Sequence, residues 1–181
     1  RLRKCGADNF HERLEEIPEQ LREVVSPLME ALGVLTSKIH VYDGRVQKLC
    51  KQVYPETQKL QQVSGVGPLT ALTFVTSLED PNRFRNNRQL GAYLGLTPPV
   101  DRSCTVDKQL PISKAGDPFL RWLLVQCAHH VLGAFGEESD LRRWGLRLSE
   151  RGGKNAKKRA VVAVARKLAV LLLALWKSGE D

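Results

Sequence analysis

Apolar side chains between residues 28 and 53 recur at alternating intervals of four and three residues. The seam that they form consists of Leu28, Leu32, Leu35, Ile39, Tyr42, Val46, Leu49 and Val53. Such positions share one face of a helix, and a repeat of more than three heptads is typical of a coiled coil. The pattern predicts a helical segment in residues 1–57, with Pro27 marking a start or a kink. Its seam either pairs with a second chain or packs on its own domain.

Residues 58–181 are predicted to form a compact helical domain. Residues 60–63, a turn at Gly65 and Gly67, and residues 68–77 follow the pattern of a helix-hairpin-helix. Both glycines allow the backbone to approach a phosphate closely, and proline suits the first position of the second helix. Short glycine turns also connect helices that touch no nucleic acid. DNA-backbone contact at this hairpin is therefore one of two interpretations.

Three further helices are predicted towards the end of the chain. Asp117-Pro118 opens a largely apolar helix over residues 118–132, residues 141–148 form a short amphipathic helix, and Asn155 caps a helix that runs to Lys177. No stretch alternates with the period of two expected of a strand. The predicted fold class is all-α.

The 181 residues carry a net charge of +8, and the isoelectric point is about 9.5. A basic balance favours an anionic partner, with nucleic acid as the first candidate. Arg83 and Arg85 are candidate phosphate contacts beside the hairpin. The most basic segment holds Lys154, Lys157, Lys158 and Arg159. Cations in the first turn of a helix oppose its dipole, so this segment is either a phosphate site or a solubilising patch.

Four scattered cysteines form no CxxC pair, which indicates reduced thiols in a cytoplasmic protein. No metal site is expected, because Cys127 and the adjacent histidines make only half of a ligand set. Arg166 and Lys167 interrupt the most apolar run, so no membrane segment is expected. The chain lacks a starting methionine, and we expect a fragment or a processed piece.

The polar stretch between residues 97 and 117 carries candidate chemistry. Ser103 lies beside Arg102, and further cations follow at Lys108, Lys114 and Arg121. A hydroxyl among cations suits an anionic ligand such as a phosphate, whereas a plain surface loop would use the same residue types for turns. The residues alone leave both interpretations open.

The order of six motifs resembles a known family. They are VSGVGPLTA (63–71), LGAYLGL (90–96), RS (102–103), ISKAGDPFLR (112–121), DLRRWGL (140–146) and ERGGKNAKKR (150–159). Together they are similar to the C-terminal part of transposases of the insertion-sequence one-ten, one-sixteen and nine-oh-two type. These are DEDD transposases, described as bridge-RNA-guided recombinases. The likeness covers nearly the whole chain.

The resemblance implies a division of roles. Ser103 matches the serine that links covalently to a DNA phosphate during cleavage and rejoining, and the coiled coil would help the protein to form a homo-oligomer. A guide RNA and magnesium would also take part, with the metal held by four acids of an N-terminal RuvC-like domain that these residues do not contain. The chain alone is therefore expected to be catalytically incomplete. Cys104 stands where relatives commonly carry glycine.

Two alternatives use the same residues differently. One is a non-catalytic helix-hairpin-helix module for DNA binding or dimerisation. The other is a helical interaction domain whose basic residues are ordinary surface.

Overall fold

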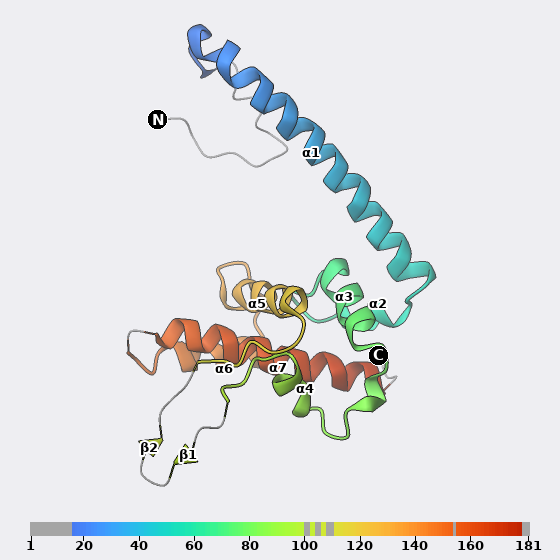
Figure 1. The fold of residues 1–181 in the computed structure, drawn as a ribbon, viewed down its shortest axis with the longest axis vertical. Coiled ribbons are helices and arrows are strands. Elements are labelled where there is room, and N and C mark those ends of the chain that lie inside the picture. Colours follow the sequence, from blue (N-terminus) through green and yellow to red (C-terminus); the bar gives the residue numbers. More distant parts are fainter. Residues whose placement is uncertain (1–15, 100–101, 104–105, 108–110, 154, 179–181) are drawn as a thin grey trace. The chain divides into compact units, whose positions relative to one another are not determined.

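A computed structural model describes residues 16–99, 102–103, 106–107, 111–153 and 155–178 of the chain. Figure 1 shows that helices dominate it. In chain order the elements are α1 (Glu19–Gln52), α2 (Glu56–Leu60), α3 (Pro68–Leu78), η2 (Pro81–Arg83), α4 (Gln89–Tyr93), β1 (Arg102–Ser103), β2 (Val106–Asp107), α5 (Pro118–Leu132), α6 (Asp140–Ser149) and α7 (Ala156–Ser178). The all-α prediction is confirmed, with one small hairpin added. The chain divides into two compact units, Arg1–Lys48 and Leu49–Asp181.

The first unit contains most of α1, one continuous helix of 34 residues (Figure 1). The long helix predicted from the seam is confirmed. It starts at Glu19 and contains Pro27, so Pro27 does not mark its start. The seam side chains are exposed except Val46, which is half-buried. Leu21 and Val25 extend the same spacing towards the start of the helix, which the sequence interpretation missed. Val53 lies just beyond the helix, although its amide still donates to the Leu49 carbonyl at 2.9 Å.

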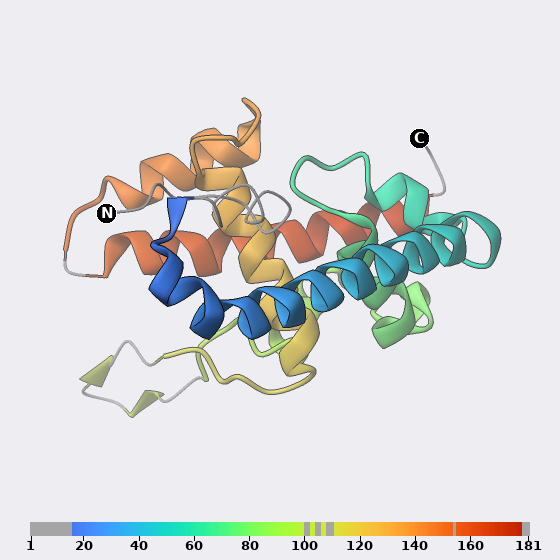
Figure 2. The same cartoon turned by 90° about the horizontal axis from the view of Figure 1, so that it is seen from above.

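The second unit is built around α7. This helix packs against α2, α4, η2, α5 and α6, and α3 packs against α2 and α5. Figure 2 shows α5 crossing α7. α7 takes this central position because of its apolar surface, where Leu168, Leu172 and Leu173 are fully buried. Each buried leucine contributes roughly 1.5–3 kcal/mol relative to an exposed one, so a helix apolar on most sides takes the centre of the fold.

The predicted helix-hairpin-helix is realised only in its second half. α3 begins at Pro68, as the sequence indicated, with Gly67 as an extended cap residue. The first helix was wrongly placed: α2 ends at Leu60, and residues 61–65 form turns and a bend. Glycine is required at position 65, where φ is +86° and an added β-carbon would lie 3.2 Å from His130 Cδ2 and 3.3 Å from the Cys127 carbonyl oxygen. The turn is thus held against α5.

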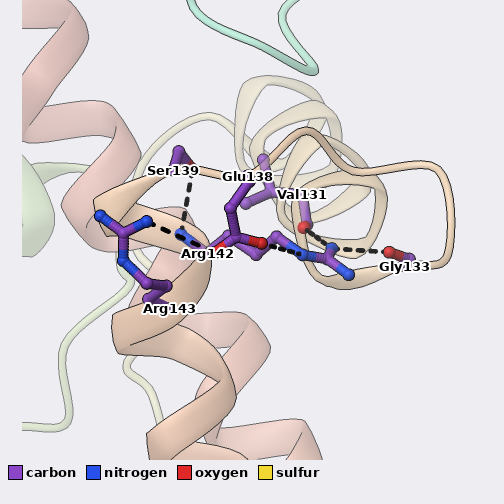
Figure 3. A network of polar contacts seen from close by, with 6 residues as sticks. All are labelled: Val131, Gly133, Glu138, Ser139, Arg142 and Arg143. Carbon is purple, nitrogen blue, oxygen red and sulfur yellow. Dashed lines mark hydrogen bonds and ion pairs between the residues drawn. The ribbon is translucent and has the colours of Figure 1, made fainter.

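The connection between α5 and α6 depends on Arg142 (Figure 3). Its guanidinium donates to the carbonyls of Val131 and Gly133 at the end of α5, and its ion pair with Glu138 spans 3.7 Å. Ser139 caps α6 by accepting a hydrogen bond from the Arg142 amide at 3.2 Å. These contacts satisfy carbonyls that the end of a helix leaves without partners.

Within the described residues, no helix is both long and apolar enough to cross a membrane.

Candidate functional site

Ser103 lies on a small hairpin that the sequence analysis treated as a loop. β1 pairs with β2 in antiparallel register, with Arg102 opposite Asp107 and Ser103 opposite Val106. These two short strands agree with the prediction of a mainly helical fold. Two-residue strands are too short for an alternating pattern, so periodicity could not reveal them. Lys108 lies outside the described residues, and so does Cys104.

The two segments that lead into and out of the hairpin are tied together by backbone hydrogen bonds. The Ser113 amide donates to the Thr97 carbonyl at 2.9 Å, and the Lys114 amide donates to the Gly95 carbonyl at 3.1 Å. Gly95 has φ of +66°, and an added β-carbon would lie 2.3 Å from the Ala115 nitrogen. Only glycine permits this approach, so the base of the hairpin is fixed where α4 ends.

Arg121 reaches the same base from the first turns of α5. Its Nη1 donates to the Leu94 carbonyl at 3.0 Å and to the Ala115 carbonyl at 2.7 Å. The guanidinium thus links the end of α4 to the segment that leaves the hairpin, and it supports the hairpin base. Phosphate binding by Arg121 stays a prediction.

Asp117 completes this support as the N-cap of α5, as predicted. Its carboxylate accepts from the Phe119 amide at 2.8 Å and the Leu120 amide at 3.3 Å, and from Ser77 Oγ at 2.9 Å. Burial raises the pKa of Asp117, but these hydrogen bonds and the charge of Arg121 outweigh burial, so the net pKa lies below its usual value. The carboxylate is therefore held in its charged form.

A pocket of about 690 Å³ lies between the base of the hairpin and the start of α7. We call it the α7 pocket. Its polar lining consists of Asn155, Lys158, Arg159 and Arg166. Its apolar lining consists of Leu96, Pro98, Pro111, Ile112, Val162 and Ala163. Pro98 precedes the hairpin and Pro111 follows it, so both ends of the Ser103 segment border the pocket. None of these lining residues is acidic.

The cations of the α7 pocket come from one face of a helix. Arg166 follows Arg159 by seven residues, which is about two turns, and Val162 and Ala163 lie between them. The sequence analysis identified Lys158 and Arg159 but missed Arg166. The seven-residue spacing was a signal that could have found it. Gly153, in the turn before α7, has φ of +92°, a backbone conformation that favours glycine.

The remaining predicted cations are distributed over the second unit. Arg83 contacts two aromatic rings, with its guanidinium carbon 5.6 Å from the Phe84 centroid and 5.2 Å from that of Tyr93. Arg85 and Lys114 are exposed, and neither lines the α7 pocket. Their roles stay predictions.

Lys157 is also exposed, yet it is not among the pocket residues although it precedes Lys158. Lys154 lies outside the described residues, and only the backbone of Arg102 is described.

Magnesium, which the family resemblance implied, finds no ligand set here. The described part of the chain contains no group of three or more His, Cys, Asp or Glu side chains that could hold a metal ion. Magnesium requires oxygen ligands, usually including carboxylates.

The fold and the α7 pocket define a mainly helical protein with a cationic, partly apolar site beside a serine-bearing hairpin. Residues 57–145 match the model of the transposase IS116/IS110/IS902 family. The chain is 33% identical over 184 residues to the transposase for insertion sequence element IS1111A of Coxiella burnetii, with 97% of this chain and 50% of that protein covered. It is 32% identical over 157 residues to a probable family 20 transposase of Pseudomonas aeruginosa, covering 83% of this chain and 46% of that protein.

The chain therefore belongs to the IS116/IS110/IS902 family of transposases. It spans about half the length of these two relatives.

Proposed function

We propose that this chain is the part of a transposase that holds DNA in the α7 pocket and presents Ser103 to a DNA phosphate. The observation that carries the proposal is the position of Lys158, Arg159 and Arg166 at the base of the Ser103 hairpin. Cations neutralise phosphate charge, and they also stabilise the charge that develops when a phosphate is attacked.

The reaction follows from serine chemistry. The Ser103 Oγ would form a bond to phosphorus while the bond from phosphorus to one deoxyribose oxygen breaks. The departing oxygen takes up a proton, and the serine loses one to a base or to water. Rejoining is the reverse attack by a deoxyribose hydroxyl, which releases the serine. The base is not assigned among the described residues, and we expect the remainder of the full-length protein to supply it together with a bound divalent metal.

The binding step is tested by the salt dependence of affinity for DNA, both single-stranded and duplex. Lys158→Ala and Arg166→Ala should each weaken binding and lower the slope of log affinity against log salt by about one per lost phosphate contact. Lys157→Ala is the matched control, because this lysine neighbours Lys158 but does not line the pocket. Equal losses of DNA affinity in Lys157→Ala and Lys158→Ala would show that the α7 pocket is not the specific site of DNA binding.

The chemical step is tested in a full-length protein that contains this chain. Denaturing electrophoresis should reveal a covalent protein–DNA adduct that Ser103→Ala abolishes. Ser113→Ala is the control, because the Ser113 hydroxyl serves a local turn in which it accepts from the Ala115 amide at 3.5 Å. An adduct that survives Ser103→Ala and disappears in Ser113→Ala would show that Ser113, and not Ser103, forms the covalent link. That result would contradict the proposal.

The exposed seam of α1 favours a second function, self-association. Leu28, Leu35 and Ile39 are each more than half exposed, and burying such a seam against a second copy is how a coiled coil gains stability. Ile39→Glu should dissociate the oligomer in sedimentation analysis. Val41→Glu is the control, since Val41 is equally apolar and exposed but lies off the seam. A monomeric wild-type protein would contradict this proposal.

Guide-RNA binding is proposed from the family resemblance, and a cytoplasmic location is proposed from the scattered cysteines. Structured RNA belongs in the same salt titration as DNA.

A non-catalytic hairpin module is the competing proposal. Its candidate contact is the backbone at Gly67, which is open because an added β-carbon would meet nothing within 4 Å. If the backbone at Gly67 approached a phosphate, Gly67→Ala would weaken DNA binding without destabilising the fold. Loss of binding in Gly67→Ala but not in Lys158→Ala would favour this alternative.

A further inference from the structure

The α7 pocket has an apolar half that phosphate binding does not explain. Pro98, Pro111 and Ile112 form one part of it, and Val162 and Ala163 of α7 form another. Phosphate oxygens gain nothing from aliphatic surface, and cations alone would have sufficed to hold them. A ligand that fits both halves carries a largely apolar group next to a phosphate.

An unpaired nucleotide has this chemistry, whereas paired DNA does not. In a duplex the faces of the bases are stacked, and a side approach meets phosphates, sugars and polar base edges. An unpaired base offers its face to apolar side chains while its phosphate stays beside it. The volume of about 690 Å³ also lies within the range of roughly 300–1,000 Å³ common for pockets that enclose a small ligand.

A second, smaller pocket adjoins the first and gives the strand a continuation. It has a volume of about 280 Å³, and it shares Arg159 and Ala163 with the α7 pocket. Arg151 and Gly152 line its other side. Arg159 thus borders both pockets, and a backbone that leaves the first pocket meets a further arginine in the second.

We infer that the α7 pocket receives one unpaired nucleotide of the DNA strand. Its base lies against Ile112, Val162 and Ala163, and its phosphate lies towards Lys158 and Arg166. The next phosphate along the strand lies between Arg159 and Arg151. This inference rests on the proposed DNA binding, and it adds that the nucleotide bound in the α7 pocket is unpaired.

The test compares four probes by fluorescence anisotropy with the full chain. They are a short oligothymidine, a strand of the same length made only of abasic residues, the corresponding duplex, and the matched ribonucleotide strand. The wild-type protein should bind oligothymidine about tenfold more tightly than the abasic strand, a preference that corresponds to roughly 1.4 kcal/mol.

Ala163→Leu fills the wall between the two pockets and should remove this preference. It should weaken oligothymidine binding about tenfold and leave abasic binding nearly unchanged. Ala174→Leu is the matched control, because Ala174 is also half-buried on α7 but lines neither pocket. Ile112→Gln is a second variant, located outside the helices, that should have the effect of Ala163→Leu if the latter fails to fold.

The outcomes separate the inference from the proposed function. Binding to no probe at low salt would overturn the proposed function itself. Equal binding of oligothymidine and the abasic strand, both weakened by Lys158→Ala, would overturn the nucleotide pocket and leave DNA binding intact. Tighter binding of the matched ribonucleotide strand would overturn the assignment to DNA.

Discussion

The alkyl chain of Arg166 lies against Gly91. A β-carbon added to Gly91 would fall 2.9 Å from Arg166 Cγ and 3.0 Å from Cδ. α4, which precedes the Ser103 hairpin, therefore determines where the side chain of a pocket arginine runs. Gly91 does not line the α7 pocket, but the absence of a side chain at position 91 allows Arg166 to take its place there.

Gly91→Ala should displace Arg166 and weaken DNA binding by about threefold, and by no more than Arg166→Ala does. The fold should persist because arginine has other rotamers and alanine favours a helix. Affinity and thermal unfolding of the same preparation provide the measurement. Gly44→Ala is the control, since nothing lies within 4 Å of its added β-carbon. Unchanged affinity in Gly91→Ala would show that the position of Arg166 is unimportant.

Arg121→Ala should destabilise the protein because two backbone carbonyls at the base of the hairpin lose their charged donor. Hydrogen bonds to charged groups contribute about 1.5–3 kcal/mol, and we expect a loss of about 2 kcal/mol in the free energy of unfolding. Urea denaturation measures it. Arg85→Ala, at an exposed arginine, should leave stability unchanged. An Arg121→Ala variant with unchanged stability and weaker DNA binding would indicate that Arg121 contacts a phosphate and does not support the hairpin base.

Asp117 should make stability depend on pH. Because its folded pKa lies below the unfolded value of about 3.9, its charged form stabilises the fold above that value, and this contribution disappears as pH falls through the folded pKa. Asp117→Ala should cost about 1 kcal/mol at neutral pH through loss of the cap. The difference from wild type should shrink below about pH 4.

Unfolding in urea at a series of pH values provides the measurement for Asp117. Ser77→Ala removes a hydrogen bond that lowers the Asp117 pKa, so it should move the loss of stability to higher pH. A difference between wild type and Asp117→Ala that does not vary with pH would contradict the assigned hydrogen bonds.

Arg142→Ala should destabilise the α5–α6 connection more than Arg143→Ala does. Arg142 is half-buried and donates to the Val131 and Gly133 carbonyls at the end of α5. Its removal takes the charged donor from both, and among the described residues only the Gly133 carbonyl keeps another donor, the Gly136 amide at 3.3 Å, so we expect a cost of about 1–3 kcal/mol. Arg143 pairs with Asp140 and Glu138 at the surface, where such pairs contribute little. Thermal unfolding of both variants gives the comparison, and equal shifts would refute the distinction.

Local patterns in the sequence sufficed for the elements whose physics is local. The α1 seam, the cap at Asp117 and the start of α3 at Pro68 depend on side-chain spacing and backbone chemistry within a few residues. The same applies to the first turn of α7, where Lys158 and Arg159 were identified as candidates before the fold was known. The order of motifs carried the family resemblance, and with it the choice of Ser103.

Only the tertiary structure decided which of these residues meet. It joined Lys158 and Arg159 to the base of the Ser103 hairpin, added Arg166, and brought the Arg121 guanidinium to two backbone carbonyls. It also placed Gly65 against α5. Each of these outcomes depends on contacts between segments far apart in the chain. A spacing pattern records which face of a helix a residue occupies, but the packing around α7 determines what that face touches.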